Sequence, residues 1–173
     1  VSAQITGKLT EVLIEEGEHV EAGQVLAQLE SRSQRAQRAE ADAQLGEARA
    51  RVRQFESELA QARRDYTRQQ DLVTRNLASV QAVEAARTQV DSLAAQLAAQ
   101  QEAVQLAAAQ VRSAQVQLDY TTVRAPFAGV VIAKAAQVGE IVSPLSAGGG
   151  FTRTGIGTLV DMDSLEVEVD VNE

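Results

Sequence analysis

Apolar residues recur at alternating steps of three and four through the middle of the chain. This heptad pattern places a stripe of side chains along an α-helix and packs it against another helix. The stripe breaks once, near Arg75 and Asn76, and then resumes. The first stripe is Leu45, Ala48, Val52, Phe55, Leu59, Ala62, Tyr66, Gln69 and Val73, and the second is Val83, Ala86, Val90, Leu93, Leu97, Gln100, Val104, Ala107, Val111, Ala114 and Leu118. The sequence therefore predicts two coiled-coil helices.

The break between the two stripes is too short for anything but an antiparallel return. Neither stripe region contains proline, and Gly46 is the only glycine within them. At 1.5 Å per residue, about 40 residues give each helix a length of roughly 60 Å. We expect a long α-hairpin over residues 31–119, with its tip near residues 74–79.

The segments on either side of the hairpin have short runs of Val, Leu and Ile separated by glycines. Residues 5–30 and 127–144 share this pattern, which predicts short strands joined by tight turns. A shift of 122 positions aligns Gly7 with Gly129, Leu9 with Val131, Gly17 with Gly139, Glu18 with Glu140, and Val20 with Val142. We expect Gly17 and Gly139 at turns that need a positive φ or a close approach of the backbone.

Neither of these segments can bury an apolar face alone, because a two-stranded sheet is marginally stable in water. We therefore expect residues 1–30 and 120–146 to close into one small β-sandwich, with the hairpin inserted between them. The predicted fold class is α+β. Residues 147–173 would hold a Gly/Ser-rich linker and then, in the apolar–polar alternation from Leu165 to Val171, the start of another β domain.

The composition narrows the class of protein. Aromatic residues make up only 3 % of the chain, so we expect a thin, elongated core rather than a large globular one. The net charge of −8, with no basic stripe, argues against binding to nucleic acid. No apolar run is long enough for a membrane span. Because the chain opens at Val1 without Met and stops inside a strand-like pattern, we expect a fragment of a longer protein.

The sequence offers no catalytic constellation. Its carboxylates are not paired with a nucleophile or a second acid, and the absence of cysteine excludes a thiolate nucleophile and a cysteine metal site. His19 is the only histidine and Met162 the only methionine, too few for a histidine or methionine metal site. We expect a non-enzyme without cofactor or metal.

Three features follow one another in a specific order along the chain. They are the half-motif G-x-L-x-x-V-x-x-x-E-G-x-x-V-x-x-G-x-x-L from Gly7, the Ala/Gln-rich hairpin, and LDYTTVRAPFAGVV at residues 118–131. In this order they resemble the periplasmic adaptor family, also called membrane fusion proteins of the HlyD type. The resemblance covers essentially the whole chain. It implies a lipoyl-like domain split into residues 1–30 and 120–146, and the start of a β-barrel domain within residues 147–173.

The hairpin tip matches a motif of this family. Adaptors that meet TolC-like outer-membrane channels carry Arg, Leu four positions later and Ser seven positions after that, as Arg68, Leu72 and Ser79 do here. The resemblance implies that the tip docks on the channel, with Arg68 as a hydrogen-bond donor and Leu72 as an exposed apolar anchor. A structural reading stays open. Ser79 suits the N-cap of the second helix, Leu72 could pack on the hairpin, and Arg68 could be a solvated charge.

The resemblance also implies a function. The full-length protein would be anchored to the inner membrane of a Gram-negative bacterium and would link a transporter to the channel across the periplasm, as part of a tripartite efflux or secretion system. The long hairpin and the ending TLVDMDSLEVEVDVNE look more like MacA-type adaptors of ABC exporters than adaptors of proton-driven RND pumps. Family members form rings of six, and small outer residues such as Ala94, Ala98 and Ala108 suit side-by-side packing.

Two other classes of protein stay open. A lipoyl-like sandwich can carry biotin or lipoate on a lysine between its halves, but the hairpin occupies that place and the only lysines are Lys8 and Lys134. A carrier would show added mass on one of them. A purely structural coiled-coil spacer would tolerate substitution of Arg68, Leu72 and Ser79.

Overall fold

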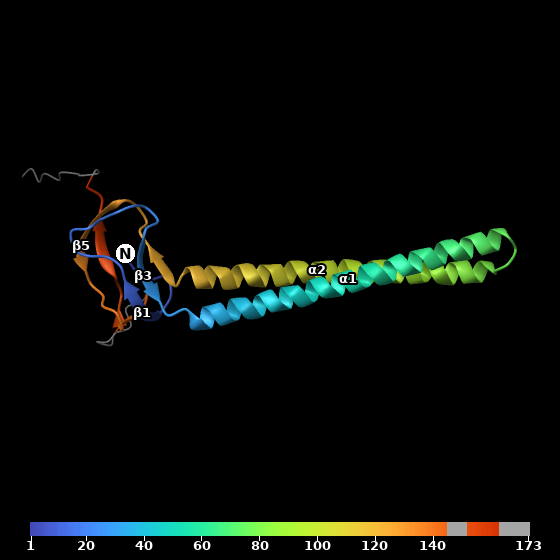
Figure 1. Ribbon diagram of the computed structural model, residues 1–173, viewed down its shortest axis with the longest axis horizontal. Helices are drawn as coiled ribbons and strands as arrows, with labels where there is room; N and C mark the ends of the chain where they lie inside the picture. The colour runs from blue at the N-terminus through green and yellow to red at the C-terminus, as the bar shows by residue number, and fades with distance from the viewer. Residues whose placement is uncertain (145–151, 163–173) are drawn as a thin grey trace, which may run out of the picture. The chain divides into compact units, whose positions relative to one another are not determined.

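The computed structural model describes residues 1–144 and 152–162, which fall into two compact units (Figure 1). One unit is a β domain built from Val1–Arg35 and the residues from Gln115 onward, and the other is Ala36–Ala114, within a helical hairpin. The expected fold class, α+β with a hairpin inserted into a split β-sandwich, is confirmed. The alternation between Leu165 and Val171 lies outside the described residues.

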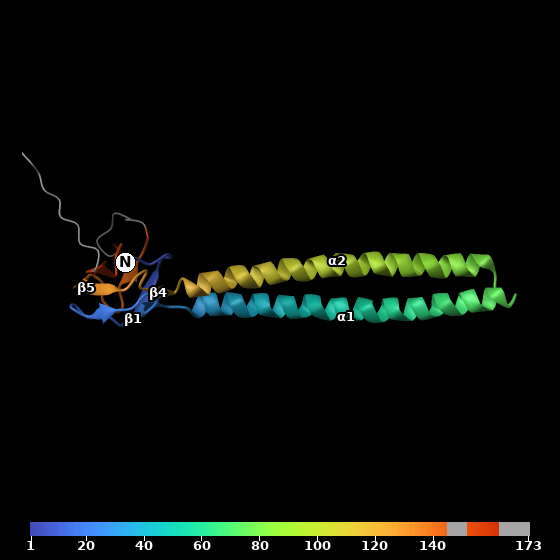
Figure 2. The same cartoon turned by 90° about the horizontal axis from the view of Figure 1, so that it is seen from above.

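The hairpin consists of α1 (Arg32–Thr74) and α2 (Val80–Asp119), which run side by side in opposite directions in Figures 1 and 2. Every residue of the two predicted stripes is buried or half-buried, and Leu59 and Leu93 are among the most buried. Charged pairs such as Arg51 and Glu47 lie on the exposed faces one turn apart. The heptad prediction is therefore confirmed. No helix in residues 1–144 or 152–162 is long and apolar enough to span a membrane.

Within residues 1–144 and 152–162, the strands of the β domain form two small sheets. The larger has the strand order β4-β3-β1-β6-β7 and the smaller β2-β5-β8, and all neighbours are antiparallel except β6 and β7. The strands are β1 (Gly7–Val12), β2 (His19–Val20), β3 (Val25–Leu29), β4 (Thr122–Arg124), β5 (Gly129–Lys134), β6 (Ile141–Val142), β7 (Thr152–Arg153) and β8 (Gly157–Val160). Strands from both ends of the chain therefore share each sheet.

The two halves bury one common core. Its largest fully buried side chains come from both, and they are Leu9, Ile14, Val20, Leu26, Val131, Val142 and Ile156. Four of these seven form two pairs related by the shift of 122 positions, Leu9 with Val131 and Val20 with Val142. Both halves thus contribute side chains to the same core, as expected from the sequence.

The shift of 122 positions also describes how the strands pair. β1 pairs with β6 so that Gly7 lies opposite Val142, and β5 pairs with β2 so that Gly129 lies opposite Val20. Gly7 in the first half is equivalent to Gly129 in the second half, and Val142 in the second half is equivalent to Val20 in the first. The same pairing therefore occurs twice, with the roles of the two halves exchanged. The β domain therefore has an approximate internal twofold symmetry.

The predicted turns follow the same symmetry. Gly17 has a φ of 89° and Gly139 a φ of 94°, as expected for glycine in a tight turn. The carboxylate of Glu18 accepts a hydrogen bond from the N–H three residues before it, at 3.0 Å. The carboxylate of Glu140 does the same at 2.8 Å. The repeated Gly-Glu pair thus builds the same turn twice.

The strand β8 shows that the β domain extends beyond the boundary expected at residue 146. β8 pairs with β5 in the same way as β3 pairs with β1. In both pairs the register shifts at an equivalent place, after Leu9 in β1 and after Val131 in β5, 122 positions later. Residues 157–160, assigned from the sequence to the segment after the sandwich, thus lie in one of its sheets. Without β8, the edge of β5 would be left unpaired.

Candidate functional site

The first helix ends in a well-defined cap at the hairpin tip. The N–H of Leu77 donates to the carbonyl of Leu72 at 2.8 Å, and the N–H of Asn76 donates to the carbonyl of Val73 at 2.9 Å. These two bonds form a Schellman motif, which satisfies carbonyls at a helix end. Its left-handed residue is Asn76, with a φ of 56°, and asparagine tolerates this conformation better than most residues. The break in the heptad pattern is therefore an ordered turn.

Ser79 caps the start of the second helix. Its Oγ accepts a hydrogen bond from the N–H of Ala82 at 3.2 Å, and its carbonyl accepts from the same group at 3.1 Å. This is the N-cap geometry that the sequence allowed for Ser79. Only Leu77 and Ala78 separate this cap from the left-handed Asn76. The two helix ends are thus joined by a very short, hydrogen-bonded connection.

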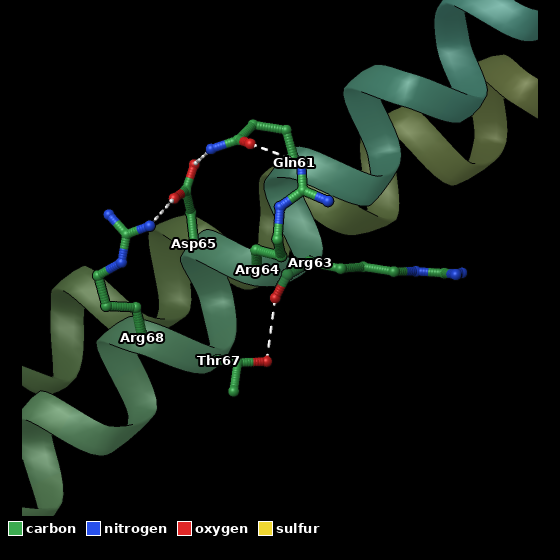
Figure 3. A network of polar contacts seen from close by, with 6 residues as sticks. All are labelled: Gln61, Arg63, Arg64, Asp65, Thr67 and Arg68. Carbon is green, nitrogen blue, oxygen red and sulfur yellow. Dashed lines mark hydrogen bonds and ion pairs between the residues drawn. The ribbon is translucent and has the colours of Figure 1, made fainter.

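Arg68 lies on an exposed face of α1, one helical turn before Leu72. Its Nη2 lies 3.2 Å from Oδ1 of Asp65, and both side chains are exposed. The other carboxylate oxygen of Asp65 accepts from Gln61 at 3.0 Å, and Gln61 accepts from Arg64 at 2.7 Å (Figure 3). An exposed pair of this kind contributes little to stability. A guanidinium has five N–H donors, so Arg68 can still bind an acceptor on another protein.

The apolar surface of the tip differs from the one expected. Leu72 is half-buried and does not form the exposed anchor, because its position beside the first stripe turns it partly toward the hairpin. The exposed apolar side chains are Leu77, at 71 %, and Val80, at 65 %. Sequence reasoning missed both. The sequence feature that could have predicted their exposure is their position between the two stripes, after Val73 and before Val83.

The two lysines of the chain both lie in strands of the β domain. Lys8 lies within β1 and Lys134 at the end of β5, where its N–H donates to the carboxylate of Glu16 at 3.0 Å. Neither lies between the two halves, where a carrier lysine would. Residues 1–144 and 152–162 contain no group of three or more His, Cys, Asp or Glu that could hold a metal ion.

Comparison with known proteins agrees with this architecture. Residues 1–147, most of the chain, match the family described as CzcB-like, barrel-sandwich hybrid domain. The macrolide export protein MacA of Escherichia coli O157:H7 is 31 % identical over 173 residues, all of this chain and 45 % of MacA. The multidrug resistance protein MdtA of Klebsiella pneumoniae is 34 % identical over 143 residues, 83 % of this chain and 31 % of MdtA. The chain thus spans less than half the length of these curated relatives.

Solved structures give the same fold. The crystal structure of MacA from Actinobacillus actinomycetemcomitans matches 94 % of this chain with a TM-score of 0.82 at 24 % identity, over 48 % of its own length. A MacA-MexA chimeric protein that contains the Pseudomonas aeruginosa MexA alpha-hairpin domain matches 90 % of this chain and 45 % of its own, with a TM-score of 0.59 and 23 % identity. The family match over residues 1–147, together with the similarity to MacA over the whole chain, shows that the chain belongs to the membrane fusion protein family, whose members are also called periplasmic adaptors.

Proposed function

We propose that this chain is the hairpin-bearing part of a periplasmic adaptor in a tripartite efflux or secretion system. The adaptor would link an inner-membrane transporter to a TolC-like outer-membrane channel. The observation that carries the proposal is a capped coiled-coil hairpin inserted between the two halves of a barrel-sandwich hybrid domain in a member of this family. The role is mechanical rather than enzymatic. The adaptor would pass the transporter's conformational cycle to the channel.

The hairpin tip is the end that we propose to dock on the channel. The tip motif of Arg68, Leu72 and Ser79 supports this assignment. Arg68 keeps donors for carboxylates or carbonyls of a partner, while Leu72 and Ser79 hold the turn through the Schellman motif and the N-cap. Exposed, well-ordered turns between rigid elements commonly carry binding residues.

The transporter that we favour is of the ABC type. The match to the macrolide export protein MacA runs over all 173 residues, which supports the likeness to MacA-type adaptors of ABC exporters. A proton-driven RND transporter is the second candidate, because MdtA, a multidrug resistance protein, matches 143 residues at a slightly higher identity. In either case the full-length protein would lie in the periplasm and be anchored to the inner membrane.

We also propose that the protein forms a ring, with six copies expected from the family resemblance. Of the three outer alanines singled out from the sequence, Ala98 is exposed, while Ala94 and Ala108 are half-buried beside the second stripe. Leu106 is 64 % exposed on α2 and extends the surface available for side-by-side packing. A full-length protein that stays monomeric at high concentration and in its complex with the channel would contradict the ring.

Exchange of the hairpin tests the proposed function. Residues 36–114 of the full-length protein would be replaced by the corresponding hairpin of a relative, an exchange for which the MacA-MexA chimera gives a precedent. In crosslinking experiments in cells, we expect the chimera to crosslink to the same inner-membrane transporter as before. We expect it to crosslink to the outer-membrane channel that works with the protein from which the hairpin was taken. If the hairpin exchange leaves the channel unchanged and alters the transporter instead, the assignment of the tip to the channel is wrong.

A further inference from the structure

Leu77 and Val80 are the two most exposed large apolar side chains in the part of the chain that the structure describes. They lie three residues apart on the short connection and at the first position of α2. A single exposed apolar residue on a protein surface is ordinary. Two of them within four residues, at the turn of a hairpin and on the end proposed to bind a partner, offer apolar area for a contact.

The fold gives neither side chain a structural task. In a Schellman motif, the residue after the left-handed one often packs on the residue whose carbonyl receives its N–H. Leu77 and Leu72 hold these places, but Leu77 is 71 % exposed, so such a contact covers little of it. Val80 follows the N-cap, where its exposed β-branched side chain is a poor helix former. Polar residues would serve the turn at least as well.

The backbone around these two residues is fixed on both sides. The N–H of Leu77 is held by the carbonyl of Leu72, and the start of α2 is held by Ser79. A side chain that is presented by an ordered backbone loses little freedom on binding. Leu72 and Ser79 therefore act as positioning residues for Leu77 and Val80.

From these observations we infer that Leu77 and Val80 form the apolar contact between the tip and the outer-membrane channel, an inference that rests on the proposed function. The partner surface that fits this pair is a slot between the helix ends of the channel. It would have small or apolar walls for the two side chains and carbonyl or carboxylate acceptors for Arg75, which is exposed beside them. A lipid surface fits less well. Membrane-surface helices carry a basic polar face, whereas the exposed charges around the turn here, Asp71, Arg75 and Glu84, are of mixed sign.

Binding of the purified full-length adaptor to a purified TolC-like channel of the same organism tests the inference. The double variant Leu77→Ser with Val80→Thr is compared with Val138→Ser, which removes a similarly exposed apolar side chain, 62 % exposed, from the β domain away from the tip. We expect the double variant to bind about tenfold more weakly or worse, as for residues at the centre of an interface. Val138→Ser should bind like the wild type, and thermal unfolding should be the same for all three proteins.

The possible outcomes separate this inference from the proposed function. Wild-type affinity in the double variant, together with weaker binding of Arg68→Ala, would overturn the inference and leave the docking proposal intact. A wild-type protein that binds no TolC-like channel would overturn both. Binding to phosphatidylglycerol-containing vesicles that is lost in the double variant, without binding to a channel, would assign the apolar pair to a membrane instead.

Discussion

Leu9 and Val131 occupy equivalent places in the two halves of the β domain, and each is held by the turn that belongs to the other. The N–H of Leu9 donates to the carbonyl of Glu140 at 2.9 Å, and its carbonyl accepts from Gly139 at 2.8 Å. Val131 makes the same two bonds, at 2.9 and 2.8 Å, with residues 18 and 17. Each half thus completes the other, although the whole hairpin lies between them in the sequence.

Because of this exchange, the segments that precede and follow the hairpin in the sequence form one domain. Its two halves are joined by backbone hydrogen bonds and by a shared core. The free energy of unfolding of the β domain therefore depends on how closely the backbones of the paired strands can approach. Substitutions at those positions give sharper tests than substitutions on the surface.

Gly129 and Gly7 are equivalent by the shift of 122 positions but should respond differently to alanine. A Cβ at residue 129 would overlap the carbonyl oxygen of Val160 on β8, whereas a Cβ at residue 7 would lie 3.4 Å from the nearest atom, Cβ of Leu29. We expect Gly129→Ala to lower the free energy of unfolding by about 2 kcal/mol, as overpacking does. Gly7→Ala should change it by less than about 1 kcal/mol. Chemical denaturation checks both, and equal effects would contradict the observed placement of β8.

Gly46 is an exposed glycine inside α1, with no atom within 4 Å of the place where a Cβ would be. Its backbone is helical, so glycine there costs conformational entropy and brings no packing advantage. We expect Gly46→Ala to stabilise the hairpin by about 0.5–1 kcal/mol. Thermal unfolding followed by circular dichroism at the helical band measures this effect. A loss of stability would mean that Gly46 allows a close contact, with another copy of the chain for example.

Ser79 should affect stability through its cap. We expect Ser79→Ala to cost about 1 kcal/mol, because the N–H of Ala82 loses the side-chain acceptor, and Ser79→Asp to keep most of that energy. Denaturation of the two variants measures the difference. If Ser79→Asp is as unstable as Ser79→Ala, the cap is not what Ser79 contributes.

Arg68 should matter little for folding. Because its pair with Asp65 is exposed, we expect Arg68→Ala to change the free energy of unfolding by less than about 0.5 kcal/mol. Any loss of channel binding in this variant would then arise at the interface. Denaturation and binding of the same preparation separate the two effects, and a large loss of stability would show that the side-chain network in Figure 3 supports the hairpin.

The sequence predicted those parts of the structure that depend on periodicity or repetition. The heptad stripes predicted the helices, because burial along a coiled coil follows spacing alone, and the repeated glycines predicted the turns at Gly17 and Gly139. β8 was missed because it is not related to β3 by the shift of 122 positions, although the two strands pair with equivalent partners. The sequence repeat therefore gives no sign of the strand that pairs with β5. At the tip, exposure depends on the three-dimensional path of a short turn, which no periodicity describes. Leu77 and Val80 therefore became visible only in the structure.

A crosslinking experiment in cells tests the central claim, that the hairpin tip meets an outer-membrane channel. The chain contains no cysteine, so Arg75→Cys places a single thiol in this part of the protein, at the exposed residue directly after α1, and Ala50→Cys places one at an exposed position far from the tip as a control. Single cysteines are introduced at the periplasmic end of a TolC-like channel in a strain that expresses the full-length protein. The account predicts a disulfide crosslink from residue 75 and none from residue 50. A folded, exported protein that gives no crosslink at residue 75, or an equal one at residue 50, would contradict it.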